Sequence, residues 1–332
     1  MAYNLTTFGN KVRSIQDTAS PSTSYEDLAM MSVMGGDALG ATSSAIMQTE
    51  IQRRLDLSGL STYEMSLVTV AWQGNNSVGY SVNDHLNRIV TIANAANSST
   101  PLNDISLIAQ MMRIRTFDFG FNDVTLKSAI ETKINDTVTY NSYLENAQCN
   151  RIVIECKDFL INNPLTTTTR DNYNDSIIRS LVTDWNTLSL DDHLMLANSV
   201  NDTTRFATGG TGIAGWQSNI TSRFITPNNL TLVDTLKARM TMNNRIADGW
   251  DNVTIDNRIV SLCNSVANSS TSVVDLLYAT KAYMETFIYA SSPTEFANLK
   301  AEIQSRINDT VNYTDLKSMY YLGKCVNLSN TL

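Results

Sequence analysis

The sequence contains few of the residues on which most protein chemistry depends. Only 17% of its 332 residues are charged, the net charge is −8, and the Lys and Arg are scattered along the chain. Proteins that bind nucleic acid concentrate positive charge where they meet phosphates, so nucleic acid is not an expected partner. No apolar run approaches the length that a membrane span requires, and MAYNLTTFGNKVRS at the start has no apolar core of signal-peptide length. We therefore expect neither a membrane partner nor a secretion signal.

Cysteine and histidine are also scarce. The four cysteines form no C-x-x-C pair, and the two histidines, His85 and His193, lie far apart in the sequence. A zinc site needs a cluster of such ligands, so we expect no metal and no cofactor. Structural, buried and reduced thiols are the expected state of Cys149, Cys156, Cys263 and Cys325.

Catalytic motifs are missing or appear in the wrong context. The spelling G-x-G-x-x-G occurs at Gly210, Gly212 and Gly215, but it follows a helix end and a polar loop instead of a strand. A dinucleotide site needs the strand, so this stretch is interpreted as a flexible connection. Asp191 and Asp192 follow Ser189 at the start of a helix, which favours capping over acid–base chemistry. The sequence therefore predicts neither an enzyme nor a small-molecule substrate.

In place of charge, the sequence is rich in Asn, Ser and Thr, with 35 Asn. These side chains hydrogen-bond nearby backbone and so favour caps and turns, which suits a chain of many short helices. Two phrases occur twice. The phrase INDTV begins at Ile134 and at Ile307, and NRIV, followed by related residues, begins at Asn87 and at Asn257.

Other segments align under these phrases and bring the number of copies to about eight. Each has an apolar-basic-apolar helix end, then polar residues, then Ser or Thr with an acid that starts a second apolar helix. The second helices are expected to start near residues 23, 61, 100, 139, 187, 231, 271 and 312. A period of roughly 40 residues is typical of stacked helical hairpins. The predicted fold is all-α, with about eight hairpins in a helical repeat array or bundle.

Local signals agree with helices. Pro293 suits a first helical position, and Phe296, Leu299, Ile303 and Ile307 fall on one helix face. No stretch shows sustained strand alternation. The expected caps of second helices are Ser24 with Asp27, Ser61 with Glu64, Thr100 with Asp104, Thr231 with Asp234 and Ser272 with Asp275.

The repeats suggest a division of the chain. Residues 1–12 form an N-terminal segment that precedes the first clear helix and is a candidate anchor to a neighbouring protein. Residues 13–161 form a first helical repeat half, 162–172 a polar joint, and 173–332 a second half.

Connections between hairpins carry Gly and aromatic residues, and two interpretations of these aromatic residues stay open. The aromatic side chains contact a partner, or they close the ends of hairpins; the residues are Trp72, Phe119, Trp216 and Trp250.

Short capped hairpins rich in Asn, Ser and Thr, of the form RIN…T…DL…A, resemble repeat segments in virion structural proteins of bacteriophages, particularly marine ones. The resemblance covers most of the chain and carries over no catalytic residue. It implies a head, neck, tail or fibre protein that forms a homo-oligomer, docks to other virion proteins and is assembled in the host cytoplasm.

Two alternatives differ in class. A cellular helical-repeat adaptor would hold a peptide in a concave groove and would show a run of alike side chains on successive helices. An all-α enzyme would show converging polar residues. The sequence displays neither pattern.

Overall fold

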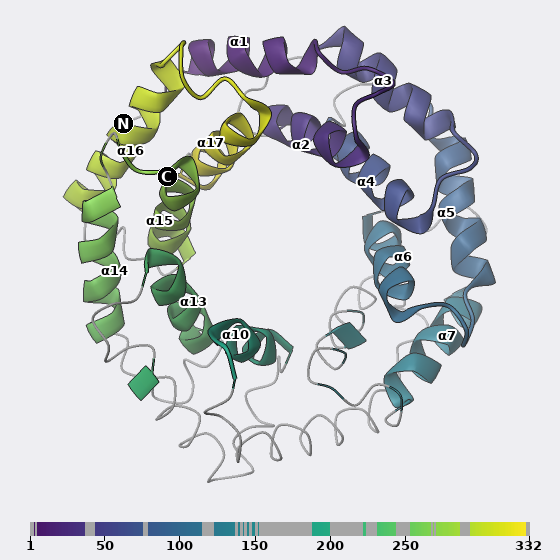
Figure 1. Cartoon of the computed structure of the whole chain (residues 1–332). Helices are drawn as coiled ribbons and strands as arrows, with labels where there is room; N and C mark the ends of the chain where they lie inside the picture. Colours follow the sequence, from purple (N-terminus) through teal and green to yellow (C-terminus); the bar gives the residue numbers. More distant parts are fainter. Residues whose placement is uncertain are drawn as a thin grey trace. The chain divides into compact units, whose positions relative to one another are not determined.

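The computed structural model describes most of the two ends of the chain and parts of its middle. The described residues are 3, 5–36, 44–75, 79–114, 123–136, 139, 142, 145, 148–149, 152, 188–199, 222–223, 231–243, 253–266, 268, 270–285 and 293–329. These residues form thirteen α-helices and no strand (Figure 1). The all-α prediction is therefore confirmed for this part of the chain.

The helices are short, between 10 and 16 residues each. They are α1 (Leu5–Gln16), α2 (Tyr25–Gly36), α3 (Ala45–Asp56), α4 (Thr62–Gln73), α5 (Asn83–Ala95), α6 (Leu102–Ile114), α7 (Asp123–Asn135), α10 (Leu190–Ser199), α13 (Leu232–Asn243), α14 (Val253–Val266), α15 (Val273–Glu285), α16 (Pro293–Asn308) and α17 (Leu316–Ser329).

The chain divides into two compact units that do not follow its two consecutive halves. Unit 1 consists of Met1–Asp84, Thr231–Leu236 and Val253–Leu332, and unit 2 of His85–Leu230 and Lys237–Asn252. Both ends of the chain thus belong to unit 1. The joint expected at 162–172 lies outside the described residues.

The second helices begin close to the positions that the sequence indicates. Seven of the eight expected starts have a described helix close by: helices α2, α4, α6, α10, α13, α15 and α17 begin within four residues of the expected positions. The expected start near 139 has no described helix. Even there, Ser142 and Glu145 exchange the hydrogen bonds of a capping box.

Local capping explains these starts. The Ser61 hydroxyl accepts from the Glu64 backbone N–H at 3.2 Å, and the Glu64 carboxylate accepts from the Ser61 N–H at 2.8 Å. Hydroxyls of Ser24, Thr231 and Ser272 accept in the same way at the starts of α2, α13 and α15. Thr100 differs from the prediction, because its hydroxyl accepts from the Asn97 N–H within the turn before α6.

The described residues of the repeated phrases form the same turn contacts. In both INDTV copies the first helix ends at the Asn, and the next Asp accepts a backbone N–H three residues on: Asp136 from Thr139 and Asp309 from Asn312, both at 2.9 Å. In the other pair, Asn97 accepts from the Ser99 N–H and Asn268 from the Ser270 N–H. The second copy of each phrase therefore encodes the same turn as the first.

The first helix begins earlier than the sequence interpretation placed it. Helix α1 starts at Leu5, inside the segment 1–12, and buries Phe8, Val12 and Gln16 on one face. Phe8 has no exposed surface. The segment is therefore held within unit 1, and its role as an anchor to another protein remains a prediction.

Unit 1 contains four complete hairpins, each made of a first and a second helix: α14/α15, α16/α17, α1/α2 and α3/α4. Among the second helices, α15 packs on α17, α17 on α2, and α2 on α4. Among the first helices, α14 packs on α16 and α16 on α1 (Figure 1). The last hairpin of the chain therefore packs on the first as one consecutive hairpin packs on the next.

Candidate functional site: the junction of the first and last hairpins

A buried arginine ties the first two hairpins together. Arg54, near the end of α3, donates from Nη2 to the carbonyl oxygens of Thr23 at 2.7 Å and Pro21 at 3.1 Å, both in the turn between α1 and α2. Its Nε donates to Glu50, one helical turn earlier, at 2.6 Å. The guanidinium also lies over the ring of Tyr25, 4.2 Å from its centroid. Because a guanidinium carries several N–H donors in a fixed geometry, Arg54 can bind its own helix and the turn of the neighbouring hairpin at the same time.

Two more arginines repeat this arrangement. Arg306, near the end of α16, donates to the carbonyl of Asn268 in the turn of the preceding hairpin at 2.9 Å and pairs with Glu302 at 2.9 Å. In unit 2, Arg223 donates to the carbonyl of Leu188, just before the cap of α10, at 3.0 Å. We call Arg54, Arg223 and Arg306 the clasp arginines. Each closes the turn of the hairpin before it in the sequence.

The junction between hairpins α16/α17 and α1/α2, which we call the seam, joins two hairpins that lie far apart in the sequence. Its second helices, α17 and α2, pack closely. A Cβ atom at Gly323 would lie 3.5 Å from the ring of Phe8 and 3.7 Å from the Met34 Cα. These separations are ordinary van der Waals contacts, so the two helices lie close together here, and Met34 is only 1% exposed.

A lysine occupies the place of the clasp at the seam. The buried residues Phe8, Val12 and Gln16 of α1 correspond in spacing to Leu299, Ile303 and Ile307 of α16. At the positions of α1 that correspond to Glu302 and Arg306 of α16, the chain has Lys11 and Ile15. The Lys11 ammonium donates to the carbonyl oxygen of Asp309 and, at 3.4 Å, to that of Arg306. The Lys11 ammonium thus reaches the neighbouring turn from a position one helical turn before that of a clasp arginine.

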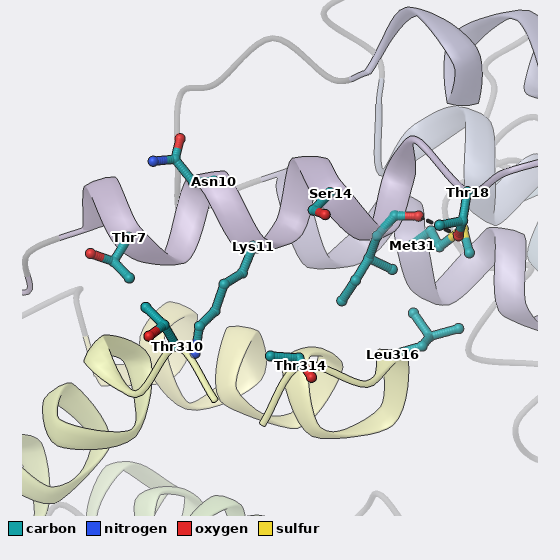
Figure 2. A pocket seen from close by; sticks show the side chains of 10 residues that line it. Thr7, Asn10, Lys11, Ser14, Thr18, Met31, Thr310, Thr314 and Leu316 are labelled. Carbon is teal, nitrogen blue, oxygen red and sulfur yellow. Dashed lines mark hydrogen bonds between the residues drawn. The ribbon is translucent and has the colours of Figure 1, made fainter. Parts of the chain in front are cut away.

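A cleft of about 730 Å³ lies where a clasp arginine would fit (Figure 2). Lys11 points from α1 toward Thr310, and Thr314 lies on the opposite wall, just before α17 (Figure 2). Thr314 stands directly before the α17 cap Asp315, as Thr23 stands before Ser24. The remaining lining residues are mostly hydroxyl or amide groups with a few apolar ones: Thr7, Asn10, Ser14, Ile15, Thr18, Met31 and Leu316.

The electrostatics of the seam are weaker than those of a clasp. Burial lowers the pKa of Lys11, and the Asp309 carboxylate opposes that shift. The Asp309 carboxylate itself accepts from Val311, Asn312 and its side chain, and these bonds lower its pKa. It is therefore fixed in the turn and does not form a close ion pair with Lys11, whereas Glu50 contacts Arg54 directly.

Tyr3, which lies before α1, adds a second contact across the seam. Its hydroxyl lies 2.7 Å from the Ser329 hydroxyl at the end of α17. The Lys300 ammonium donates to the Ser329 carbonyl at 3.0 Å and lies 5.3 Å from the Tyr3 ring centroid. Burial raises the pKa of Tyr3 and lowers that of Lys300. Both ends of the chain are thus fixed to each other.

The aromatic residues proposed as partner contacts are not gathered into a site. Trp72 lies within α4 and is 4% exposed, so its ring is covered within the chain. This burial fits the alternative that the ring closes the end of a hairpin. Phe119, Trp216 and Trp250 lie outside the described residues, as do Gly210, Gly212 and Gly215.

The polar residues considered as possible catalytic groups have structural roles. Asp192 accepts from the Ser189 N–H and the Ser189 hydroxyl accepts from the Asp192 N–H, which confirms the capping interpretation. Cys149, Cys263 and Cys325 are buried and free, and burial raises the pKa of both Cys263 and Cys325 to about 12. Thiols with such values do not ionise near neutral pH and are poor nucleophiles.

Two observations concern other kinds of site. Within the described residues, no three His, Cys, Asp or Glu side chains are placed to hold a metal ion. Among the described helices, none combines the length and the apolar composition needed to cross a membrane.

The sequence contained a signal for the clasp arginines but not for the seam. At the end of each of these first helices, an Arg directly before a buried apolar residue marks Arg54 and Arg306, although their carbonyl partners lie more than 30 residues away. Lys11 and Ile15 were missed, because nothing local to them shows that α1 meets the turn after α16. Comparison of the chain with models of protein families, with curated proteins and with solved structures finds no match.

Proposed function

We propose that the chain is a structural component of a bacteriophage particle, in the head, neck, tail or fibre. It acts by self-association and by docking to other virion proteins, without catalysing a reaction. The observation that carries the proposal is the repeated clasp. Buried polar side chains such as Arg54 and Arg306 are used to join one hairpin to the next, which suits a rigid building block.

The proposal includes the full array of about eight hairpins of roughly 40 residues. The described residues contain five complete hairpins, α1/α2, α3/α4, α5/α6, α14/α15 and α16/α17, and one helix from each of three more, α7, α10 and α13. The repeated turns of the INDTV and NRIV phrases support a common origin of these hairpins. The resemblance of the repeats to phage virion segments supplies the setting.

Light scattering of the purified chain over a range of concentrations tests self-association. We expect a defined oligomer, because a particle component repeats in copies. A monomer at every concentration, together with capture of a single cellular peptide, would favour the helical-repeat adaptor instead. Mass spectrometry of purified particles from the source of the sequence tests the setting, and absence of its peptides there would refute a virion role.

A further inference from the structure

The seam differs from the other junctions of unit 1 because the two hairpins that it joins do not follow each other in the sequence. Hairpins α14/α15 and α16/α17 follow each other directly in the sequence, as do α1/α2 and α3/α4. Hairpins α16/α17 and α1/α2 stand at opposite ends of the 332 residues. Their contact is therefore non-covalent and is not enforced by a short connecting loop.

The two hairpins of the seam cover each other through their second helices. Helices α2 and α17 pack on each other, and Met34 of α2, which lies beside Gly323 of α17, is only 1% exposed. Each hairpin, or an identical copy of it in a second chain, offers the same surface to the other.

Complementary ends of one chain can meet within that chain or between two chains. The two outcomes use the same contacts and compete through the effective concentration of the ends within one molecule. At the first helices of the seam, Lys11 and a cleft take the place of a Glu–Arg pair, and the two hairpins do not follow each other in the sequence. This combination favours exchange at the seam over exchange at α2/α4 or α15/α17.

We propose that the seam is the self-association surface of the protein. The α1/α2 hairpin of one copy packs on the α16/α17 hairpin of a second copy, with the same contacts as within one chain. The partner is a second copy of this chain, and the contact is head-to-tail. This inference rests on the proposed function, since it specifies how self-association occurs.

Cysteines at positions 34 and 323 report which chains meet. A Cβ at Gly323 lies 3.7 Å from the Met34 Cα, which is a spacing that a disulfide can bridge after the substitutions Met34→Cys and Gly323→Cys. When the double variant is oxidised at low concentration, it should yield an internally linked monomer, locked in the closed form. Light scattering then compares locked and reduced protein at high concentration.

We expect the reduced double variant and the wild type to form the oligomer, and the locked protein to remain monomeric. Oligomers of equal mass from locked and reduced protein would overturn the seam inference while leaving self-association intact. Monomers from wild type and reduced variant alike would instead refute the proposed self-association. The two failures are therefore distinguishable.

A mixing experiment excludes closure within one chain altogether. Chains with only Met34→Cys and chains with only Gly323→Cys are unfolded, mixed, refolded together at high concentration and oxidised. We expect a covalent dimer that contains one chain of each kind, whereas each variant alone should give none. Absence of the mixed dimer, when circular dichroism shows both variants helical, would overturn the inference. Each variant in the mixing experiment carries a single substitution, so this experiment still tests the inference if the double variant does not fold.

Discussion

Arg306 serves two junctions at once, and Lys11 is its partner at one of them. The Lys11 Nζ lies 3.4 Å from the Arg306 carbonyl oxygen, while Arg306 Nη2 donates to the Asn268 carbonyl at 2.9 Å. A cation from each first helix thus reaches the turn or helix end of the hairpin beside it. The same relation continues from the last hairpin to the first, and this joins the two ends of the chain in one stack within unit 1.

The Glu50–Arg54 pair should contribute strongly to stability. Arg54→Met leaves the Glu50 carboxylate, whose side chain is 5% exposed, with the more exposed Arg53 as its remaining ion partner and removes two bonds to carbonyl oxygens. We expect a loss of about 3 kcal/mol in the free energy of unfolding, measured by urea titration. The double variant Glu50→Gln/Arg54→Met is the control. It should lose clearly less than Arg54→Met alone, because the buried carboxylate charge is removed together with the guanidinium, and equal losses would contradict this account.

Rebuilding a clasp at the seam should stabilise it. The double substitution Lys11→Glu/Ile15→Arg gives α1 a Glu and an Arg at the positions that correspond to Glu302 and Arg306 of α16, and the new side chain fills the cleft. We expect an increase of about 1 kcal/mol in the free energy of unfolding, seen as a higher melting temperature.

The single variant Lys11→Glu is the control for this change. It should be destabilised, because a carboxylate then faces the carbonyl oxygens of Arg306 and Asp309 without the new guanidinium. A double variant no more stable than Lys11→Glu would show that Ile15 does not occupy the clasp position.

The fold class and the helix starts were predictable from sequence because caps and helical spacing act over a few residues. Ser61 and Glu64 form their capping box within one turn, and Phe296, Leu299, Ile303 and Ile307 all lie on the buried face of α16. The seam was not predictable in this way. The contact of Tyr3 with Ser329 joins residues at opposite ends of the chain, and neither residue carries a local mark of it. The burial of Trp72 likewise depends on which helices surround α4.

Gly74 should be intolerant of a side chain. It follows α4, and a Cβ atom there would lie 2.9 Å from the backbone N of Val33 and 2.8 Å from the Ser32 hydroxyl of α2. Backbone cannot yield without moving α2 from α4, so Gly74→Ala should cost about 1–3 kcal/mol in urea titration. Gly59→Ala is a matched control, because no atom lies within 4 Å of its new Cβ. Similar losses at both positions would contradict a close α2–α4 approach.

The Tyr3–Ser329 bond should stabilise the seam measurably. Tyr3→Phe removes the hydroxyl that lies 2.7 Å from the Ser329 oxygen, and we expect a loss of about 1 kcal/mol in the free energy of unfolding. In a Ser329→Ala background the same substitution should cost much less, because the partner is already gone. An unchanged cost in that background would show that the Tyr3 hydroxyl does not act through Ser329, since the ring beside Lys300 is retained in the variant.

His85 should make the protein less stable in mild acid. Burial, with a smaller contribution from the charge of Arg88, lowers the pKa of His85 to about 4, below its ordinary value of 6.5. Between these values the unfolded chain binds a proton that the folded chain does not, so stability present above pH 6.5 is lost as pH falls. From pH 6.5 to pH 5 the loss should be about 2 kcal/mol. Urea titrations at several pH values should show this slope in the wild type and a flatter one in His85→Gln, and parallel slopes would rule out His85 as the cause.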